Sequence, residues 1–340
     1  MRAIVRRAGP AAVPLALALL LAAAAGAPAG TAGISALGPY PGLGGCGVFP
    51  SPPPSLSPRA PSLPDQAAWN QDISRAPVAP NSGAIIAYID SHGGDHLHPD
   101  FGSPRSYGFP YAVVGAGQPR LPVRYTAYGG ESDPGPFPIP KTTPVEGGRR
   151  SDGDRHVLVV DRSRCRLYEL YHSFFKGRGR DHWNADSGVE WNLRSRALRR
   201  DGWTSADAAG LPIFPGLVRL DEARSGRIGH AIRVTFDSTR NAWIHPASHC
   251  AGDTSNADAP PMGLRLRLRR AYGLGRFSGP AKVIARALKR YGMINADNGS
   301  NWFISGSSDR RWSDANLNQL KRIPGRAFEV VRSAARVHRC

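Results

Sequence analysis

Short runs of alternating apolar and polar residues are the main pattern along the chain, and this pattern is typical of β-strands. Residues 263–269 place leucine and arginine at alternate positions, as in a half-buried antiparallel strand with leucines on one face and arginines on the other. The apolar runs 156–160 and 166–171 flank a polar Asp-Arg-Ser-Arg turn, which predicts a hairpin. Residues 231–236 and 243–245 predict a second pair of strands.

Helical periodicity is clear in only two places. Between Ser278, a suitable N-cap, and Gly292, a suitable terminator, apolar residues recur three and four positions apart on one face. A shorter helix is predicted from about Asp314 to Arg322. Because strands and long connections dominate, the chain is predicted to be mainly β, a jelly-roll-like β-sandwich with a few surface helices.

The first residues have the pattern of an export signal. Three arginines precede an apolar run of alanine and leucine at residues 11–25, and residues 27–29, Ala-Pro-Ala, match a cleavage site. We therefore expect residues 1–29 to be a signal peptide that is removed, and the mature protein to be secreted and extracellular. An uncleaved anchor is the alternative, but the apolar run is short and made of small residues for a membrane span. No second apolar run of about 18 residues follows.

Beyond the signal, composition divides the chain. Residues 30–64 are rich in proline, glycine and serine and are predicted to be an extended segment. Residues 65–340, which begin with short apolar pieces such as 85–89, are predicted to be a single β-rich domain. The 39 glycines and 31 prolines are too many for a helical bundle and agree with a domain that has many turns.

Four cysteines, Cys46, Cys165, Cys250 and Cys340, make an even set in an exported chain, so two disulfides are expected. No Cys-x-x-Cys pair is present, which excludes a zinc ribbon and a thioredoxin-like motif. Three connectivities are possible. We expect Cys165–Cys250 within the body and Cys46–Cys340 between the ends.

The formal net charge of +18 points to anionic partners, but its composition weakens that inference. Only five of the 44 basic residues are lysine, and an excess of arginine is also typical of a GC-rich genome. The charge is uneven: residues 30–140 carry a net −2 and residues 141–340 a net +17. The charge therefore favours an acidic substrate only mildly.

Several blocks of the sequence are distinctive as a set: Leu97–Gly102, Asp154–Asp161, Gly202–Pro212, Asp221–Glu222, Gly229–Arg233, Tyr291–Ile294 and Ala296–Ser300. Together they resemble a family of exported bacterial proteins of actinobacterial type that are known as hypothetical proteins. The resemblance covers roughly residues 46–331 and implies export and a single domain. That family has no assigned activity, so the resemblance carries over no catalytic residue.

Carboxylates are the first candidates for catalysis, because a glycoside hydrolase needs two across a cleft, one of them protonated. Asp100, Asp154 and Glu222 are predicted to be catalytic, and Asp297 is predicted to bind substrate. Tryptophans could stack on sugar rings, and Trp203 is the one we assign to the substrate.

Histidines and arginine suggest a second chemistry, proton abstraction beside a substrate carboxylate, as in a polyuronate lyase. His230 is predicted to be catalytic, and Arg233, His245 and His98 are predicted to bind substrate. A loop that contains His92, Asp95, His96, His98 and Asp100 could ligate a metal, but loop spacing constrains ligands little. We predict no metal and no cofactor.

These features favour a secreted carbohydrate-active protein, a hydrolase or lyase that acts as a monomer on a wall or environmental polysaccharide, with an anionic polymer as one candidate. A non-catalytic extracellular module that binds an anionic polymer is one alternative, and a metal-dependent phosphodiesterase or nuclease is another. No G-x-S-x-G elbow, P-loop or dinucleotide-binding glycine motif is present.

Overall fold

The computed structural model describes residues 34–47, 68–102 and 107–340. The predicted signal peptide, residues 1–29, and most of the predicted extended segment lie outside the described residues. The α-helices in the described part are α1 (Ser82–Ser91), α2 (Leu220–Ser225), α3 (Gly279–Arg290) and α4 (Asp314–Leu317). The strands there are β1 (Ala112–Val114), β2 (Val123–Tyr125), β3 (Val157–Asp161), β4 (Arg166–Tyr171), β5 (Phe174–Lys176), β6 (His182–Ala185), β7 (Ser187–Asn192), β8 (Ile232–Phe236), β9 (Ala242–Trp243), β10 (Arg265–Leu268), β11 (Met293–Asn298), β12 (Phe303–Ile304), β13 (Phe328–Val330) and β14 (His338–Arg339).

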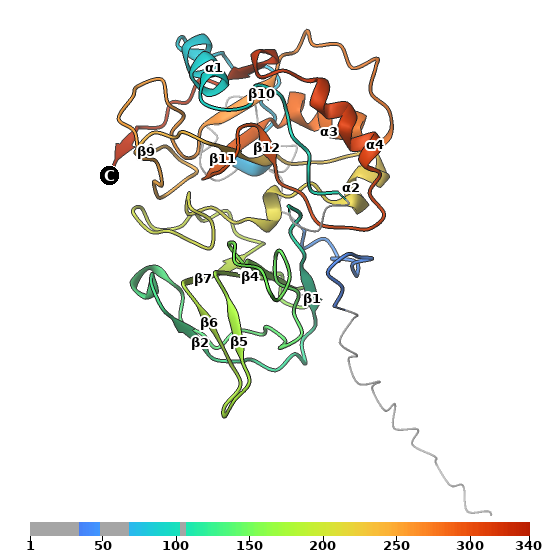
Figure 1. Ribbon diagram of the computed structural model, residues 1–340, viewed down its shortest axis with the longest axis vertical. Coiled ribbons are helices and arrows are strands. Elements are labelled where there is room, and N and C mark those ends of the chain that lie inside the picture. Colours follow the sequence, from blue (N-terminus) through green and yellow to red (C-terminus); the bar gives the residue numbers. More distant parts are fainter. Residues whose placement is uncertain (1–33, 48–67, 103–106) are drawn as a thin grey trace, which may run out of the picture.

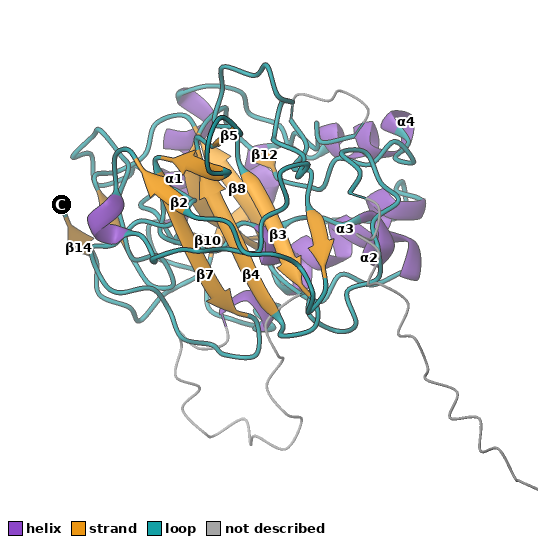
Figure 2. Cartoon of the chain, turned by 90° about the horizontal axis from the view of Figure 1, so that it is seen from below, coloured by secondary structure: helices purple, strands orange, loops and turns teal. Residues whose placement is uncertain are grey.

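A four-stranded sheet in the order β1-β3-β4-β7 has both of its faces buried. Along β3, Val157 and Val159 belong to one apolar cluster, whereas Leu158 and Val160 belong to another, as the two-residue period of a strand requires. The first cluster joins this sheet to the three-stranded sheet β2-β6-β5. The second joins it to the five-stranded sheet β12-β8-β11-β10-β13. Figure 1 shows these layers from the side, and in Figure 2 they are seen from below, one behind another.

The five-stranded sheet carries the helices. Helix α3 contacts β10 and helix α1 contacts β13, and both lie with this sheet in the upper half of Figure 1. Each of the three larger sheets includes one parallel pair, β1 with β3, β2 with β6, and β8 with β11. The prediction of a mainly β chain with a few helices is confirmed, with sheets that are mixed rather than purely antiparallel.

Local sequence patterns succeed where the pairing is local. The predicted hairpin is formed by β3 and β4, with Val159 opposite Tyr168, and the predicted helix before Gly292 is α3. The prediction that residues 231–236 pair with 243–245 is wrong: β8 pairs with β11 and β12, and β9 pairs with β14.

The alternating strand β10 is more deeply buried than its arginines suggest. Arg267 is buried and forms an ion pair with Glu329 at 2.8 Å, and Arg265 donates hydrogen bonds to the carbonyl oxygens of Gln71 and Tyr291. Both arginines of the strand are therefore bound by the protein's own chain, whereas Arg269, just after the strand, is exposed.

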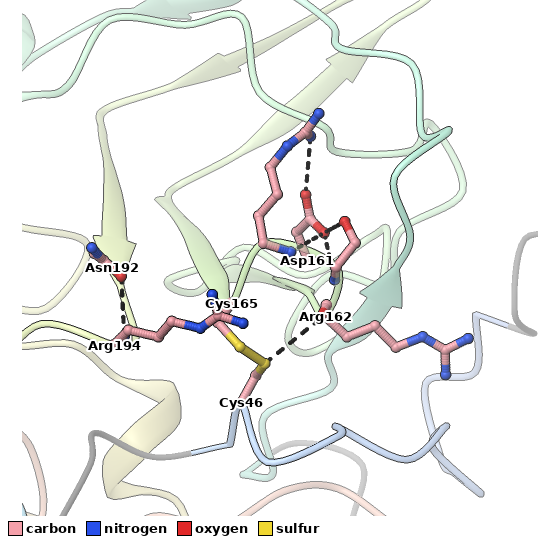
Figure 3. The surroundings of a disulfide bond; sticks show 8 residues. Cys46, Asp161, Arg162, Cys165, Asn192 and Arg194 are labelled. Carbon is pink, nitrogen blue, oxygen red and sulfur yellow. Dashed lines mark hydrogen bonds and ion pairs between the residues drawn. A yellow bond between two sulfur atoms is a disulfide. The ribbon is translucent and has the colours of Figure 1, made fainter.

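Two disulfides are present, but the expected pairing is wrong. The bonds are Cys46–Cys165 and Cys250–Cys340, with Cα atoms 5.1 and 6.6 Å apart. The tight turn between β3 and β4 places Cys165 beside the N-terminal segment (Figure 3), where Asp161 accepts hydrogen bonds from the backbone of the turn. Such pairs of cysteines are typical of an oxidising compartment. No helix among the described residues is long and apolar enough to span a membrane.

Candidate functional site

The largest group of the sequence-predicted residues gathers at two adjoining cavities of about 340 and 160 Å³. Asp154, His156 and Asp297 line both cavities, and we call the combined space the cleft. Its residues come from the loop before β3, from the end of β11, from β8 and from the 204–208 loop. The cleft therefore forms where the four-stranded and five-stranded sheets pack together.

A buried arginine organises one wall of the cleft. Arg233 on β8 donates to both carboxylate oxygens of Asp207, at 3.1 and 2.8 Å, and to Asp297 Oδ2 at 2.6 Å. The guanidinium of Arg233 also donates a hydrogen bond to the hydroxyl of Ser305 at 2.9 Å. Asp297 reaches Arg233 where the parallel pairing of β8 and β11 shifts register after Asn295, and such irregularities re-aim side chains.

A buried histidine organises another part of the wall. His156 Nδ1 lies 2.5 Å from Glu146 Oε2, and Nε2 lies 2.9 Å from the carbonyl oxygen of Ala206. Both partners are acceptors, so both ring nitrogens carry protons and the ring is an imidazolium. Burial lowers the pKa of His156, but the carboxylate of Glu146 more than reverses this and raises it to about 9.

Asp297 and Asp154 are the two carboxyl groups that line both cavities. Burial raises the pKa of Asp297 to about 7; Arg233 opposes the rise, and the nearby carboxylates of Asp207 and Asp154 add to it. Asp207 is fully buried and bound by two nitrogens of Arg233, whereas the side chain of Asp297 is 21 % exposed. Burial also raises the pKa of Asp207, but Arg233 binds both of its carboxylate oxygens and opposes that rise, so we assign the negative charge to Asp207 and the proton that the pair holds near neutral pH to Asp297. The carboxylate of Asp154 is exposed beside it, with no hydrogen-bond partner for its side chain among the described residues.

Two exposed aromatic rings stand in the two halves of the cleft. Tyr107, which is 58 % exposed, lines the larger cavity near Phe303, at a ring distance of 6.1 Å. Tyr128, which is 47 % exposed, lines the smaller cavity. An aromatic ring with one open face offers a flat apolar platform, with a polar tip, to a ligand. The carboxylates thus lie between two platforms.

Of the residues predicted to be catalytic or to bind substrate, Asp100, Asp154, Arg233 and Asp297 line the cleft. Asp100 is at its outer edge and is held by Lys321 Nζ at 2.5 Å and by His98 Nδ1 at 3.0 Å. His98 stacks on Phe303, a lining residue, and so supports the edge without lining the cavity itself.

The remaining predicted residues lie elsewhere. Glu222 on α2 pairs with the fully buried His230 at 3.1 Å and with Arg219 at 2.7 Å, and this pairing lowers the pKa of Glu222 although burial raises it. Trp203 packs near the guanidinium groups of two arginines, and His245 bonds to Asp201 at 2.9 Å. None of these four predicted residues lines either cavity.

The tryptophans are mainly part of the core and do not form sugar platforms. All except Trp203 are buried. The histidine loop also separates into independent pairs: His96 with Asp95 at 2.7 Å, and His98 with Asp100. Within the described residues, no three of the histidine and aspartate side chains of this loop lie close enough together to bind one metal ion. The loop therefore gives no support to a metal-dependent nuclease.

Sequence reasoning missed His156, Asp207 and Glu146 as well as both tyrosines. His156 directly precedes the apolar run of β3, and Asp207 lies in an alanine-rich loop, where a polar residue that must be buried needs a partner. These positions were therefore detectable as polar residues in apolar surroundings, but their partners are far away in the sequence.

Comparisons with models of protein families, with curated proteins and with solved structures found no match for this chain.

Proposed function

We propose that this protein is a secreted glycoside hydrolase that cleaves an extracellular polysaccharide in the cleft. The observation that carries the proposal is the pair Asp297 and Asp154, two carboxyl groups in one cleft: Asp297 is held by an arginine and burial raises its pKa, whereas the Asp154 carboxylate is exposed and has no hydrogen-bond partner among the described residues. Glycoside hydrolysis uses such a pair, one group as acid and one as anion. The predicted signal peptide and the two disulfides support export.

In this mechanism Asp297 donates its proton to the glycosidic oxygen as the bond to the anomeric carbon breaks. The Asp154 carboxylate faces the positive charge that develops on the sugar ring, and acts there as the nucleophile or as the base for a water molecule. Arg233 and Asp207 hold Asp297 in position. Because the donor must be protonated, the catalytic rate should fall as the pH rises above about 7.

The substrate should be a neutral or cationic polymer. The cleft contains more carboxylates than cations, and Arg233 already uses four of its five N–H donors on Asp207, Asp297 and Ser305, so it has little capacity left to bind a uronate. This arrangement favours hydrolysis over the lyase chemistry that histidine and arginine suggested. The tyrosines on either side of the carboxylates would bind sugar units on both sides of the scissile bond, as in an enzyme that cleaves within a chain.

The test is product formation by the purified mature chain on a panel of neutral polysaccharides, with polyuronates alongside. We expect new reducing ends and an early loss of viscosity on at least one neutral polymer. Asp297→Asn and Asp154→Asn should each reduce the rate by about a hundredfold or more. Asp95→Asn, an exposed carboxylate outside the cleft, is the matched control and should leave the rate unchanged. Circular dichroism and the melting temperature establish that each variant is folded.

Other outcomes point to the other functions. Binding to a polymer without any product would identify a binding module instead. Absorbance of an unsaturated product would identify a lyase. Activity that is abolished by a chelator and restored by a divalent metal would favour the phosphodiesterase alternative on its own substrates. Full activity of Asp297→Asn would overturn the assignment of the acid even if the protein is a hydrolase.

A further inference from the structure

We propose that Asp201, His245 and His338 form a surface site for a zinc ion, separate from the cleft. A nitrogen of each histidine and a carboxylate oxygen of Asp201 all lie within 4.8 Å of one another. This is the only such group of three found within the described residues. The inference does not depend on the proposed hydrolase activity.

Three separate parts of the chain bring these ligands together. Asp201 lies in the loop before the cleft residue Asp207, His245 follows β9, and His338 lies in β14. Strand β14 pairs with β9, where His338 is opposite Trp243 and stacks on its ring at 3.9 Å. The stacking fixes the plane of the imidazole, as a partner that orients a metal ligand does.

The position of β14 is itself fixed. The disulfide Cys250–Cys340 attaches the chain two residues after His338. On the other side, His245 Nε2 is 2.9 Å from Asp201 Oδ1, so two of the three ligands already touch. Both histidines are therefore held near the carboxylate before any ion arrives, which reduces the entropy that binding must overcome.

The donor set favours zinc. Two imidazole nitrogens and one carboxylate oxygen are common zinc ligands, at about 2.0–2.2 Å from the metal, and a tetrahedral ion would take water in the fourth position. In such a site the ligand atoms lie about 3.3 Å apart. Asp201 is 52 % exposed, so its side chain can turn to close the remaining distance. Hard ions such as Mg²⁺ prefer all-oxygen sites and fit less well.

A bound ion would link the loop that leads to Asp207 to the C-terminal strand. The hydrogen bonds that already hold the loop there include Asp201–His245, the backbone bond from Gly202 to Ser248 at 2.7 Å, and the bond from the Ser248 hydroxyl to the carbonyl oxygen of Trp203 at 2.8 Å. The site is thus expected to be structural, and its loss should change stability more than any catalytic step.

The test is calorimetric titration of zinc chloride into the untagged, oxidised protein after removal of metals with a chelator. We expect one zinc ion per chain. His338→Ala and Asp201→Asn should each weaken binding at least tenfold. His96→Ala removes a histidine from a similar exposed pair, with Asp95 at 2.7 Å but without a third ligand, and should bind zinc like the wild type.

Thermal unfolding gives a second measurement. At a zinc concentration about a hundredfold above the wild-type dissociation constant, the melting temperature of the wild type should rise by several degrees, and that of Asp201→Asn, which binds zinc at least tenfold more weakly, should rise by no more than about half as much. Asp201 is largely exposed, so this variant should fold normally. The proposal is overturned if the wild type binds no zinc at about 100 µM free zinc, because a structural site should have a dissociation constant below that concentration. Binding that survives both substitutions overturns it equally.

Discussion

Replacement of Glu146 by glutamine should remove a pH-dependent part of the stability that the buried His156 provides. His156 is 2 % exposed and Glu146 15 % exposed, with 2.5 Å between the ring nitrogen and the carboxylate oxygen. The histidine is charged in the folded protein because the glutamate raises its pKa to about 9 from the ordinary 6.5. In the unfolded chain that partner is lost.

The magnitude follows from the two pKa values. A difference of about 2.5 pH units at 1.36 kcal/mol each is about 3 kcal/mol. Because the folded pKa is the higher one, this contribution is fully present below pH 6.5 and is lost as the pH rises through 9. Glutamine cannot stabilise the imidazolium in this way, and burial then favours the neutral ring. The free-energy difference between wild type and Glu146→Gln should therefore be about 3 kcal/mol larger at pH 6.5 than at pH 9.5.

Urea unfolding with the disulfides intact, repeated at intervals from pH 6 to 9.5, measures this difference. Subtraction of the variant from the wild type removes the contributions of titrating groups that lie away from His156. Asp95→Asn, which breaks the exposed pair with His96, is the control and should show no comparable trend. A wild-type to Glu146→Gln difference that stays constant across this range would refute the reasoning, because it would mean that His156 does not change its charge there.

Three further predictions concern the scaffold. Gly263→Ala should destabilise the protein by about 2 kcal/mol or more, because Gly263 has a φ of +81° and a Cβ atom there would collide with the carbonyl oxygen of a neighbouring segment, as thermal unfolding can show. The double replacement of Cys46 and Cys165 by serine opens a link between residues 119 positions apart, and urea unfolding should show a loss approaching about 4.7 kcal/mol, the loop-entropy value for about 100 residues. Trp302→Phe removes the indole N–H that donates to Asp90 Oδ1 at 2.9 Å, and should cost about 1–3 kcal/mol in the same measurement.

The sequence predicted what depends on neighbours in the chain. The hairpin of β3 and β4 and the amphipathic helix α3 are each set by a short stretch, and both were correctly predicted. Helix α1 was missed, because residues 85–89 form a brief apolar run that suits a strand equally well. Four carboxylate or arginine positions of the cleft were also named in advance.

What could not be predicted depends on contacts between distant segments. The bond from Arg233 to Asp207 spans 26 positions and that to Asp297 spans 64, and only the folded chain shows that one guanidinium holds both. The disulfide pairing failed for the same reason, since spacing alone does not distinguish three connectivities. The burial of the arginines of β10 could not be predicted, because leucine and arginine alternate in the same way whether water or protein covers the arginine face.

The cleft lies at the interface between two sheets, and this position has a consequence for the order in which parts of the chain fold. Its two walls are contributed by chain segments that can each begin to form independently, β3 and β4 on one side and β8 with β11 on the other. The pairing of β8 with β11 and the docking of the sheets close long loops, and such steps are slow. We therefore expect the cleft to be among the last parts of the molecule to assemble. Slow-exchanging amides should appear first in the β3–β4 hairpin during refolding, well before any probe of the cleft reports its final environment.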